Sequence, residues 1–116
     1  SGVWCRAPRE GRASKLGFAA QIMGDSEVTE PDKSNTGSIY AVLPPIAMPA
    51  KPEGQRNQEA GICDGPHVVC TINGVVTEDV NFDDHDELRP RLRKGFICLT
   101  DHDSYVAFRN IRIKPL

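Results

Sequence analysis

The stretch HVVCTINGVVTEDV, residues 67–80, decides the fold of this chain. Two runs rich in β-branched residues flank the dipeptide Asn73-Gly74. Both central residues of a type I′ turn need positive φ, which asparagine and glycine adopt at the lowest cost. The sequence therefore predicts a two-stranded antiparallel hairpin with its turn at Asn73-Gly74.

Similar short apolar runs, separated by Gly, Pro and Asn, recur along the whole chain. This spacing is typical of an antiparallel sandwich or barrel and not of alternating helices and strands. We predict a single all-β domain over residues 1–116, because a chain of 116 residues has room for one modest core. The predicted strands cover residues 2–7, 16–23, 38–43, 58–63, 67–72, 75–80, 95–100 and 105–113.

The first predicted strand begins almost at Ser1, and the chain does not open with Met. We therefore expect further strands of the domain to precede Ser1, which would leave one sheet edge unpaired and open to association with another chain.

The overall composition disfavours two classes of partner. The net charge is -2, the basic residues are scattered and only 6 % of the residues are aromatic, so nucleic acid finds neither a basic footprint nor stacking platforms. No apolar run approaches the roughly 20 residues of a membrane-spanning helix. We expect neither nucleic acid nor a membrane as partner.

None of the four cysteines belongs to a C-x-x-C pair, and each lies in an apolar stretch; they are Cys5, Cys63, Cys70 and Cys98. We interpret them as buried free thiols, and a single bridge or a metal site remains the alternative. If residues 64–66 form a three-residue turn, Cys70 faces Ala60 and not Cys63. The redox compartment stays open.

Three polar features are candidates for a site, each with a plainer alternative. Asp101-His102-Asp103 could be a base oriented by a carboxylate, a metal ligand or a polar turn. The acidic run 83–87 lacks the spacing of a calcium loop and is followed by arginines, which favours a solvated, self-compensating loop. Trp4 could be a platform for sugar stacking or a core residue.

Five segments in order resemble one known family: SGVWCRAP, GFAAQIMGD, TGSIYAVLPP, INGVVTEDVNFDD and LRPRLRKGFICLTDHDSYVAFRNIRIKPL. The chain resembles the later part of the 3-keto-disaccharide hydrolase domain, which has a concanavalin A-like jelly-roll fold. The most specific match is the end of the chain, which is similar to the family's G-L-Q-D-H-G and F-R-N-I-R-I motifs. The resemblance implies a β-sandwich that lacks its N-terminal strands.

The same resemblance implies a function. Members of this family would act on glycosides that carry a ketone at sugar carbon 3, removing the proton on carbon 2 and eliminating the group on carbon 1. The partner would be a 3-keto-sugar glycoside, a divalent metal could assist, and the protein would be bacterial and extracytoplasmic, either periplasmic or secreted.

Residue by residue, the resemblance implies that His102 is the catalytic base or a ligand and that Asp101 orients it. Arg6 would clamp the substrate or stabilise an oxyanion, and Gln21 would bind substrate. Arg109 would do the same, unless it is a buried arginine that ties the last strand to a loop. Trp4 is added as a substrate contact.

The chain also departs from the family pattern. Ala19 stands where the family has an acidic residue, and Gly24 stands where it has an aspartate. Asp25 or Asp103 could compensate. The departures leave a second hypothesis open, a non-catalytic carbohydrate-binding or interaction module with a degenerate site. A third is a fragment that needs the segment before Ser1 for its function.

Overall fold

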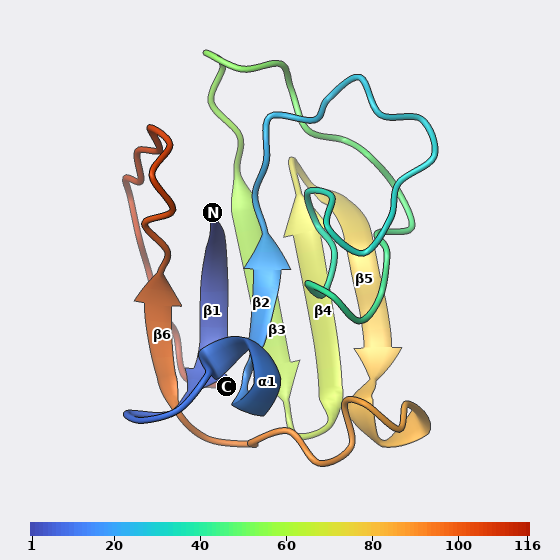
Figure 1. Ribbon diagram of the computed structural model, residues 1–116, viewed down its shortest axis with the longest axis vertical. Coiled ribbons are helices and arrows are strands. Elements are labelled where there is room, and N and C mark those ends of the chain that lie inside the picture. Colours follow the sequence, from blue (N-terminus) through green and yellow to red (C-terminus); the bar gives the residue numbers. More distant parts are fainter.

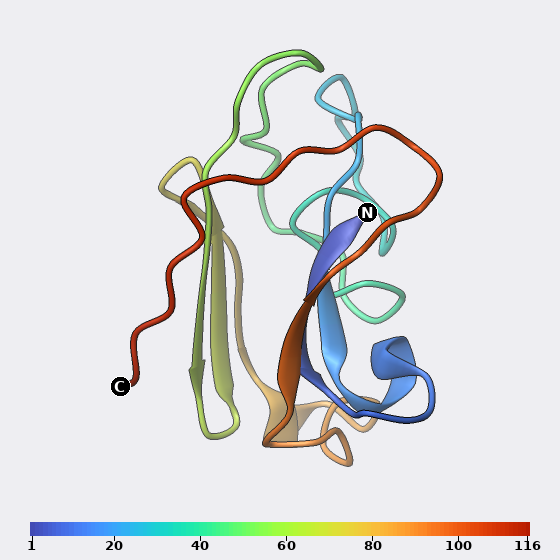
Figure 2. The ribbon, with the colours of Figure 1, turned by 90° about the vertical axis from the view of Figure 1, so that its left-hand side faces the viewer.

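The computed structural model describes all of residues 1–116 as two three-stranded antiparallel sheets that face each other (Figure 1, Figure 2). The first sheet has the order β2-β1-β6 and consists of β1 (Gly2–Ala7), β2 (Phe18–Gln21) and β6 (Phe96–Leu99). The second sheet has the order β3-β4-β5 and consists of β3 (Glu59–Asp64), β4 (His67–Ile72) and β5 (Val75–Asn81). The predicted all-β sandwich is confirmed.

Helical structure is limited to two short segments, α1 (Ala13–Leu16) and the 3-10 turn η1 (Phe82–Asp84). No helix of the chain is long and apolar enough to cross a membrane.

Local turn chemistry builds the second sheet. Asn73 and Gly74 have φ values of 51° and 78°, as a type I′ hairpin requires. The Asn73 side chain also donates to the carbonyl of Pro49 at 3.0 Å and accepts from the backbone N–H of Gln58 at 2.9 Å. The turn before β4 has two residues and not three, because Asp64 pairs with His67, and Cys70 therefore faces Gly61 and not Ala60.

The first sheet is assembled from distant segments. β1 pairs with β2 and with β6, which lies at the other end of the chain. The register against β6 shifts between Trp4 and Ala7, and Arg6 in this interval has a φ of 56°. This β-bulge turns the Arg6 side chain toward the space between the sheets, where it is buried.

The core fills the space between the sheets. Phe18 of β2 meets Phe82 of η1 edge to face, with ring centroids 5.2 Å apart. The buried cluster draws on both sheets and on the loops that follow β2 and β5; its members are Phe18, Ala20, Ile39, Val42, Val68, Cys70, Phe82 and Leu88. Because long-range segments meet here, the core joins the two sheets into one unit.

Two predicted strands are wrong. Residues 38–43 form only isolated bridges, Ala20 with Ile39 and Ile39 with Leu43, because the chain turns sharply at Ala41, whose φ is 64°. Residues 105–113 form no strand; this segment leaves β6, crosses the end of the sandwich and runs down its side (Figure 2). No strand offers it a partner, and Tyr105 is 97 % exposed.

Candidate functional site

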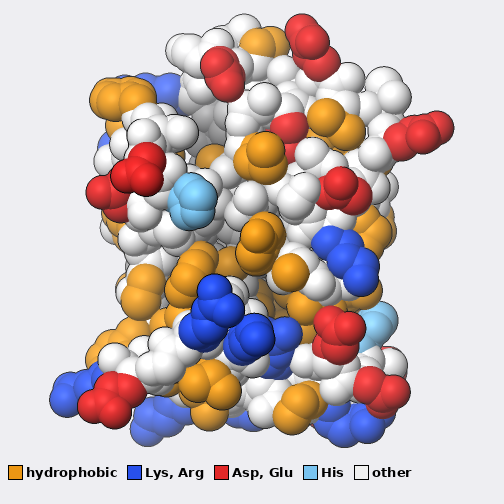
Figure 3. Space-filling view, in the orientation of Figure 1, with side chains coloured by type: hydrophobic (Ala, Val, Ile, Leu, Met, Phe, Trp, Pro, Cys, Tyr) orange, Lys and Arg blue, Asp and Glu red, His pale blue; other side chains and the backbone are white.

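A hollow of about 210 Å³ lies at the end of the first sheet where β1 begins and β2 ends. Three of the six site residues chosen from the sequence meet there: Trp4, Gln21 and His102. The remaining lining residues are Ser1, Met23, Tyr40 and Thr100. Figure 3 shows the molecule in the same orientation as Figure 1, with hydrophobic side chains gathered in the middle of this face and basic side chains below them over α1.

Strand register explains why Trp4 and Gln21 meet. Gly2 pairs with Gln21 and Trp4 pairs with Ala19. Since side chains alternate between the faces of a sheet, Trp4, Ala19 and Gln21 share one face. Ala19, which stands where the family pattern has an acidic residue, therefore lies on this face, and it is only 3 % exposed.

The segment after β6 brings His102 to the same place. The backbone N–H of Thr100 donates to the carbonyl of Gly2 at 3.0 Å, and the Ser1 hydroxyl donates to the carbonyl of Thr100 at 2.8 Å. These bonds extend the pairing beyond Leu99, and His102 follows two residues later. The imidazole is exposed and makes no hydrogen bond with any protein group.

Tyr40 is the functional candidate that sequence reasoning missed. Its backbone N–H donates to the carbonyl of Ala19 at 2.9 Å, which holds Tyr40 beside β2, and Tyr40 lines the hollow. Ile39 is fully buried and its neighbour Tyr40 is 39 % exposed, so the two side chains take opposite directions. The alternation within the predicted strand 38–43 was the available signal, since it already separated Ile39 from Tyr40.

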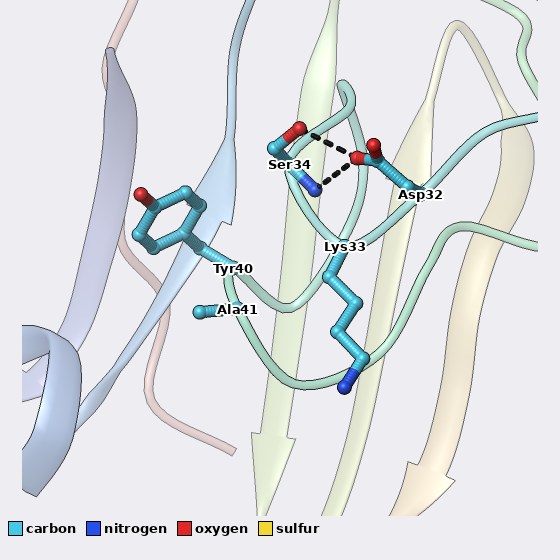
Figure 4. Close-up of a pocket in the computed structure, with 5 residues that line it drawn as sticks. All are labelled: Asp32, Lys33, Ser34, Tyr40 and Ala41. Carbon is cyan, nitrogen blue, oxygen red and sulfur yellow. Dashed lines mark hydrogen bonds between the residues drawn. The ribbon is translucent and has the colours of Figure 1, made fainter.

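Tyr40 also borders a second, more open hollow of about 420 Å³, shown in Figure 4. The Tyr40 ring points away from the Asp32 carboxylate. This carboxylate accepts from the Ser34 backbone N–H at 2.7 Å and from the Ser34 hydroxyl at 2.5 Å. These bonds lower the pKa of Asp32 below its ordinary value. Lys33 and Ala41 complete the lining.

The loop that presents Tyr40 is fixed by the buried carboxylate of Asp25. This carboxylate accepts from the Asn35 amide at 2.9 Å, from the Thr36 backbone N–H at 2.7 Å and from the Thr36 hydroxyl at 2.6 Å. Asp25 is 7 % exposed. Its hydrogen bonds are directed within the loop, so nothing here supports Asp25 as a replacement for the family's acidic residue.

The other three site residues chosen from the sequence lie elsewhere. Arg6 is 7 % exposed, and its Nη2 donates to the carbonyl of Gly65 at 2.6 Å in the turn before β4. Asp101 is exposed and makes no hydrogen bond to His102. Arg109 is exposed on the segment without secondary structure, where no buried tie to a loop exists.

The acidic run 83–87 is neutralised by neighbouring arginines, as its sequence indicates. Arg93 pairs with Asp83 at 2.7 Å and Arg89 pairs with Asp86 at 3.1 Å. These pairs are solvent-exposed, so each contributes little to stability. The run is a self-compensating loop.

Residues 1–114 match the model of the 3-keto-alpha-glucoside-1,2-lyase-like domain. The chain belongs to this family. No curated protein matches the sequence. The chain is also similar to two solved structures from Parabacteroides distasonis ATCC 8503, both provisionally named glycosyl hydrolases.

The first of these proteins has a TM-score of 0.63 and 20% sequence identity, over 72% of this chain and 44% of that one. The second has a TM-score of 0.54 and 17% identity, over 72% of this chain and 41% of that one. The chain thus spans less than half the length of either protein, and the likeness establishes a shared fold. The family match is what supports a carbohydrate-active function.

In line with this family membership, the hollow offers groups suited to a polyhydroxylated ligand. Trp4 and Tyr40 supply aromatic surface, and the Gln21 amide can both donate and accept. The Thr100 hydroxyl is buried without a hydrogen-bond partner, on a residue that lines the hollow.

The same hollow does not fit a divalent metal. No group of three or more His, Cys, Asp or Glu side chains in the chain could hold a metal ion. The hollow contributes one imidazole and no carboxylate, whereas a hard divalent cation is usually held by carboxylate oxygens. Any chemistry in the hollow therefore depends on its own side chains.

Proposed function

We propose that the hollow binds a glycoside with a ketone at sugar carbon 3 and that His102 removes the proton on carbon 2. The observation that carries this proposal is the convergence of Trp4, Gln21 and His102, three residues from distant parts of the sequence, on one hollow. Family membership supports this choice of substrate class.

The reaction would proceed by elimination. The ketone acidifies the proton on carbon 2, which a nitrogen of the His102 imidazole accepts, and the electron pair delocalises onto the ketone oxygen as an enediolate. Collapse of the enediolate breaks the bond between carbon 1 and the glycosidic oxygen, and this oxygen leaves as an alcohol by taking the proton that the His102 imidazole had accepted. Water then adds at carbon 1 and completes the net cleavage.

The surrounding side chains would have distinct tasks. The Gln21 amide can donate to the developing oxyanion, which lowers the barrier because the donor is already in place. Trp4 and Tyr40 can cover the apolar face of the sugar ring. Histidine is suited to the base role because its protonation equilibrium lies closest to neutral pH.

The test is release of a chromogenic leaving group from a 3-keto-glucoside by the parent chain and by the His102→Ala variant. We expect the variant to lose roughly a hundredfold or more in kcat/KM, the usual contribution of a general base. His67→Ala is the matched control, because His67 lies on the second sheet and is exposed. Equal rates for the parent and His102→Ala would refute the assignment of the base.

A non-catalytic carbohydrate-binding module is the second candidate, and a specific observation favours it. Ala19 stands where the family has an acidic residue, on the same sheet face as Trp4 and Gln21, and no carboxylate is among the residues that line the hollow with His102. Calorimetric titration with the 3-keto-glucoside and with the unoxidised glucoside separates the two candidates. Binding of both sugars without release from either would establish the binding module.

A further inference from the structure

Tyr40 belongs to the lining of two hollows. One is the hollow of about 210 Å³ that also contains Gln21 and His102, and the other is the more open hollow of about 420 Å³ beside Asp32 and Ser34. Figure 4 shows the Tyr40 ring on the side of the second hollow that faces β2, with the Asp32 carboxylate on the opposite side. Because one side chain lines both hollows, they adjoin, and a ligand longer than one sugar ring can extend from the first into the second.

The walls of the second hollow are held in place by hydrogen bonds within their own loop. The backbone N–H of Ala41 donates to the carbonyl of Lys33 at 2.9 Å, which joins the two ends of the lining. The backbone N–H of Asp32 donates to the Asn35 side chain at 2.7 Å, and the Asn35 amide donates to the buried Asp25 carboxylate at 2.9 Å. The hollow is therefore formed before a ligand arrives, which keeps the ordering cost of binding low.

Two charged side chains of this lining keep hydrogen-bonding capacity for a ligand. The Asp32 carboxylate accepts both bonds from Ser34 at Oδ1, and its Oδ2 accepts none from the protein. The Lys33 ammonium forms no ion pair, and Figure 4 shows it turned away from Asp32. The second hollow thus offers one strong acceptor and one strong donor.

These groups suit a ligand that is rich in hydroxyl groups. A hydroxyl both donates and accepts, so it can replace the water that solvates the Asp32 carboxylate and the Lys33 ammonium. The two formal charges cancel, which gives an ionic ligand no net attraction. An apolar ligand would displace the same water without replacing its hydrogen bonds, and this costs free energy. Tyr40 and Ala41 supply the apolar surface on which the carbon face of a sugar ring can rest.

We propose that the second hollow is a leaving-group site. It binds the group on carbon 1 of a glycoside whose oxidised ring lies in the first hollow, and it selects a polyhydroxylated leaving group, a second sugar, over an apolar one. This inference rests on the proposed function for the place of the oxidised ring. Tyr40 lies where the two parts of the ligand meet, and Asp32 and Lys33 determine specificity without taking part in bond breaking.

The test is calorimetric titration of the full chain with maltose, methyl α-glucoside and phenyl α-glucoside. These ligands share one glucose ring and differ in the group on carbon 1, and none carries the ketone, so binding is measured without turnover. We expect maltose to bind roughly tenfold more tightly than methyl α-glucoside, the effect of one or two added hydrogen bonds. Phenyl α-glucoside should bind no more tightly than methyl α-glucoside.

Three variants assign the preference for maltose to the second hollow. Lys33→Met removes the ammonium and keeps the length of the side chain, and Asp32→Asn removes the charge and keeps the acceptor for Ser34. Each should lower the affinity ratio of maltose to methyl α-glucoside severalfold. Lys15→Met is the matched control and should keep the parent's ratio, because Lys15 is an exposed lysine on α1 that lines neither hollow.

The proposal is overturned if the parent binds maltose and methyl α-glucoside equally tightly, or if phenyl α-glucoside binds as tightly as maltose. It is also overturned if Lys33→Met and Asp32→Asn both keep the parent's ratio. Release of the chromogenic group from the 3-keto-glucoside is measured in parallel and reports on the proposed function alone. Its absence would count against His102 as the base, whereas a preference for maltose that depends on Lys33 would still support two adjoining sugar sites.

Discussion

The segments His67–Asn81 and Tyr105–Ile113 share an alternation of apolar and polar residues but have opposite fates. The first forms β4 and β5, joined by the turn at Asn73-Gly74. The second forms no strand, and its isoleucines at 111 and 113 are 59 % and 72 % exposed. Each strand of the hairpin has its partner next to it in the sequence, whereas residues 105–113 need a partner strand from a distant part of the chain. An alternation of apolar and polar residues therefore predicts which side chains share a face, but a strand forms only where a partner strand is available.

The largest expected effect on stability concerns Phe82, which follows the hairpin and lies in the core. Phe82→Ala removes a fully buried ring that meets Phe18 edge to face. We expect a loss of roughly 3–5 kcal/mol in the free energy of unfolding, the usual cost of such a truncation. Urea denaturation measures it. Tyr105→Ala, at a 97 % exposed ring, is the control and should be close to neutral.

A second effect depends on pH and belongs to β5. Burial raises the pKa of Glu78 from 4.5 to about 8, and its Oε1 has no hydrogen-bond partner. The folded state therefore holds a proton that the unfolded chain releases, so stability should fall as pH rises from about 4.5 to about 8. Glu78→Gln should remove this contribution and gain on the order of 2 kcal/mol at pH 8.

Unfolding in urea across that pH range tests the Glu78 prediction. Some slope should persist in Glu78→Gln below about pH 7, because burial also raises the pKa of Glu59 to about 7. A variant with the parent's full pH dependence, or one less stable than the parent at pH 8, would contradict the assignment.

The hairpin turn itself should contribute less. Gly74→Ala adds a Cβ that meets nothing within 4 Å, so the change tests the φ of 78° alone. We expect a loss of about 1 kcal/mol in the free energy of unfolding. Gly61→Ala is the matched control, since its Cβ also meets nothing within 4 Å and its φ is not positive. Equal losses for both variants would show that the turn geometry is not decisive.

The smallest effect is expected in the last segment. Replacing Ile111 and Ile113 together by lysine should change the free energy of unfolding of the chain by less than about 0.5 kcal/mol, as for other exposed positions. Thermal unfolding measures the change, with sedimentation to record the oligomeric state. A loss above about 1 kcal/mol, or a change in oligomeric state, would reveal a partner strand for this segment and remove the contrast with the hairpin.

The parts of the fold that depend on local chemistry could be predicted from the sequence. The Asn73-Gly74 turn fixed the hairpin, and β3 was found within one residue of its predicted start and end. The segment 38–43 could not be resolved in this way, because Ala41 is not a turn-forming residue and its turn is closed by bonds to Lys33 and between Ile39 and Leu43. The fate of 105–113 was likewise undetermined, since pairing between distant segments leaves no local signal.

In the candidate site, too, some residues could be predicted from the sequence and others could not. Trp4, Gln21 and His102 were selected by resemblance and by residue type, and they converge on one hollow. The burial of Arg6 could not be anticipated, because it depends on a bulge that local sequence does not mark. Tyr40 reaches the hollow through a long loop held by the buried Asp25 carboxylate, a network that joins residues about ten apart and follows no motif.

The bulge in β1 also has an evolutionary consequence. Trp4, before the bulge, lines the candidate hollow, and Arg6 within the bulge joins the two sheets. Deleting or inserting one residue here would exchange the two faces of the strand downstream and misplace both functions at once. Lineages that carry this domain should therefore tolerate point substitutions along β1 far better than changes in its length.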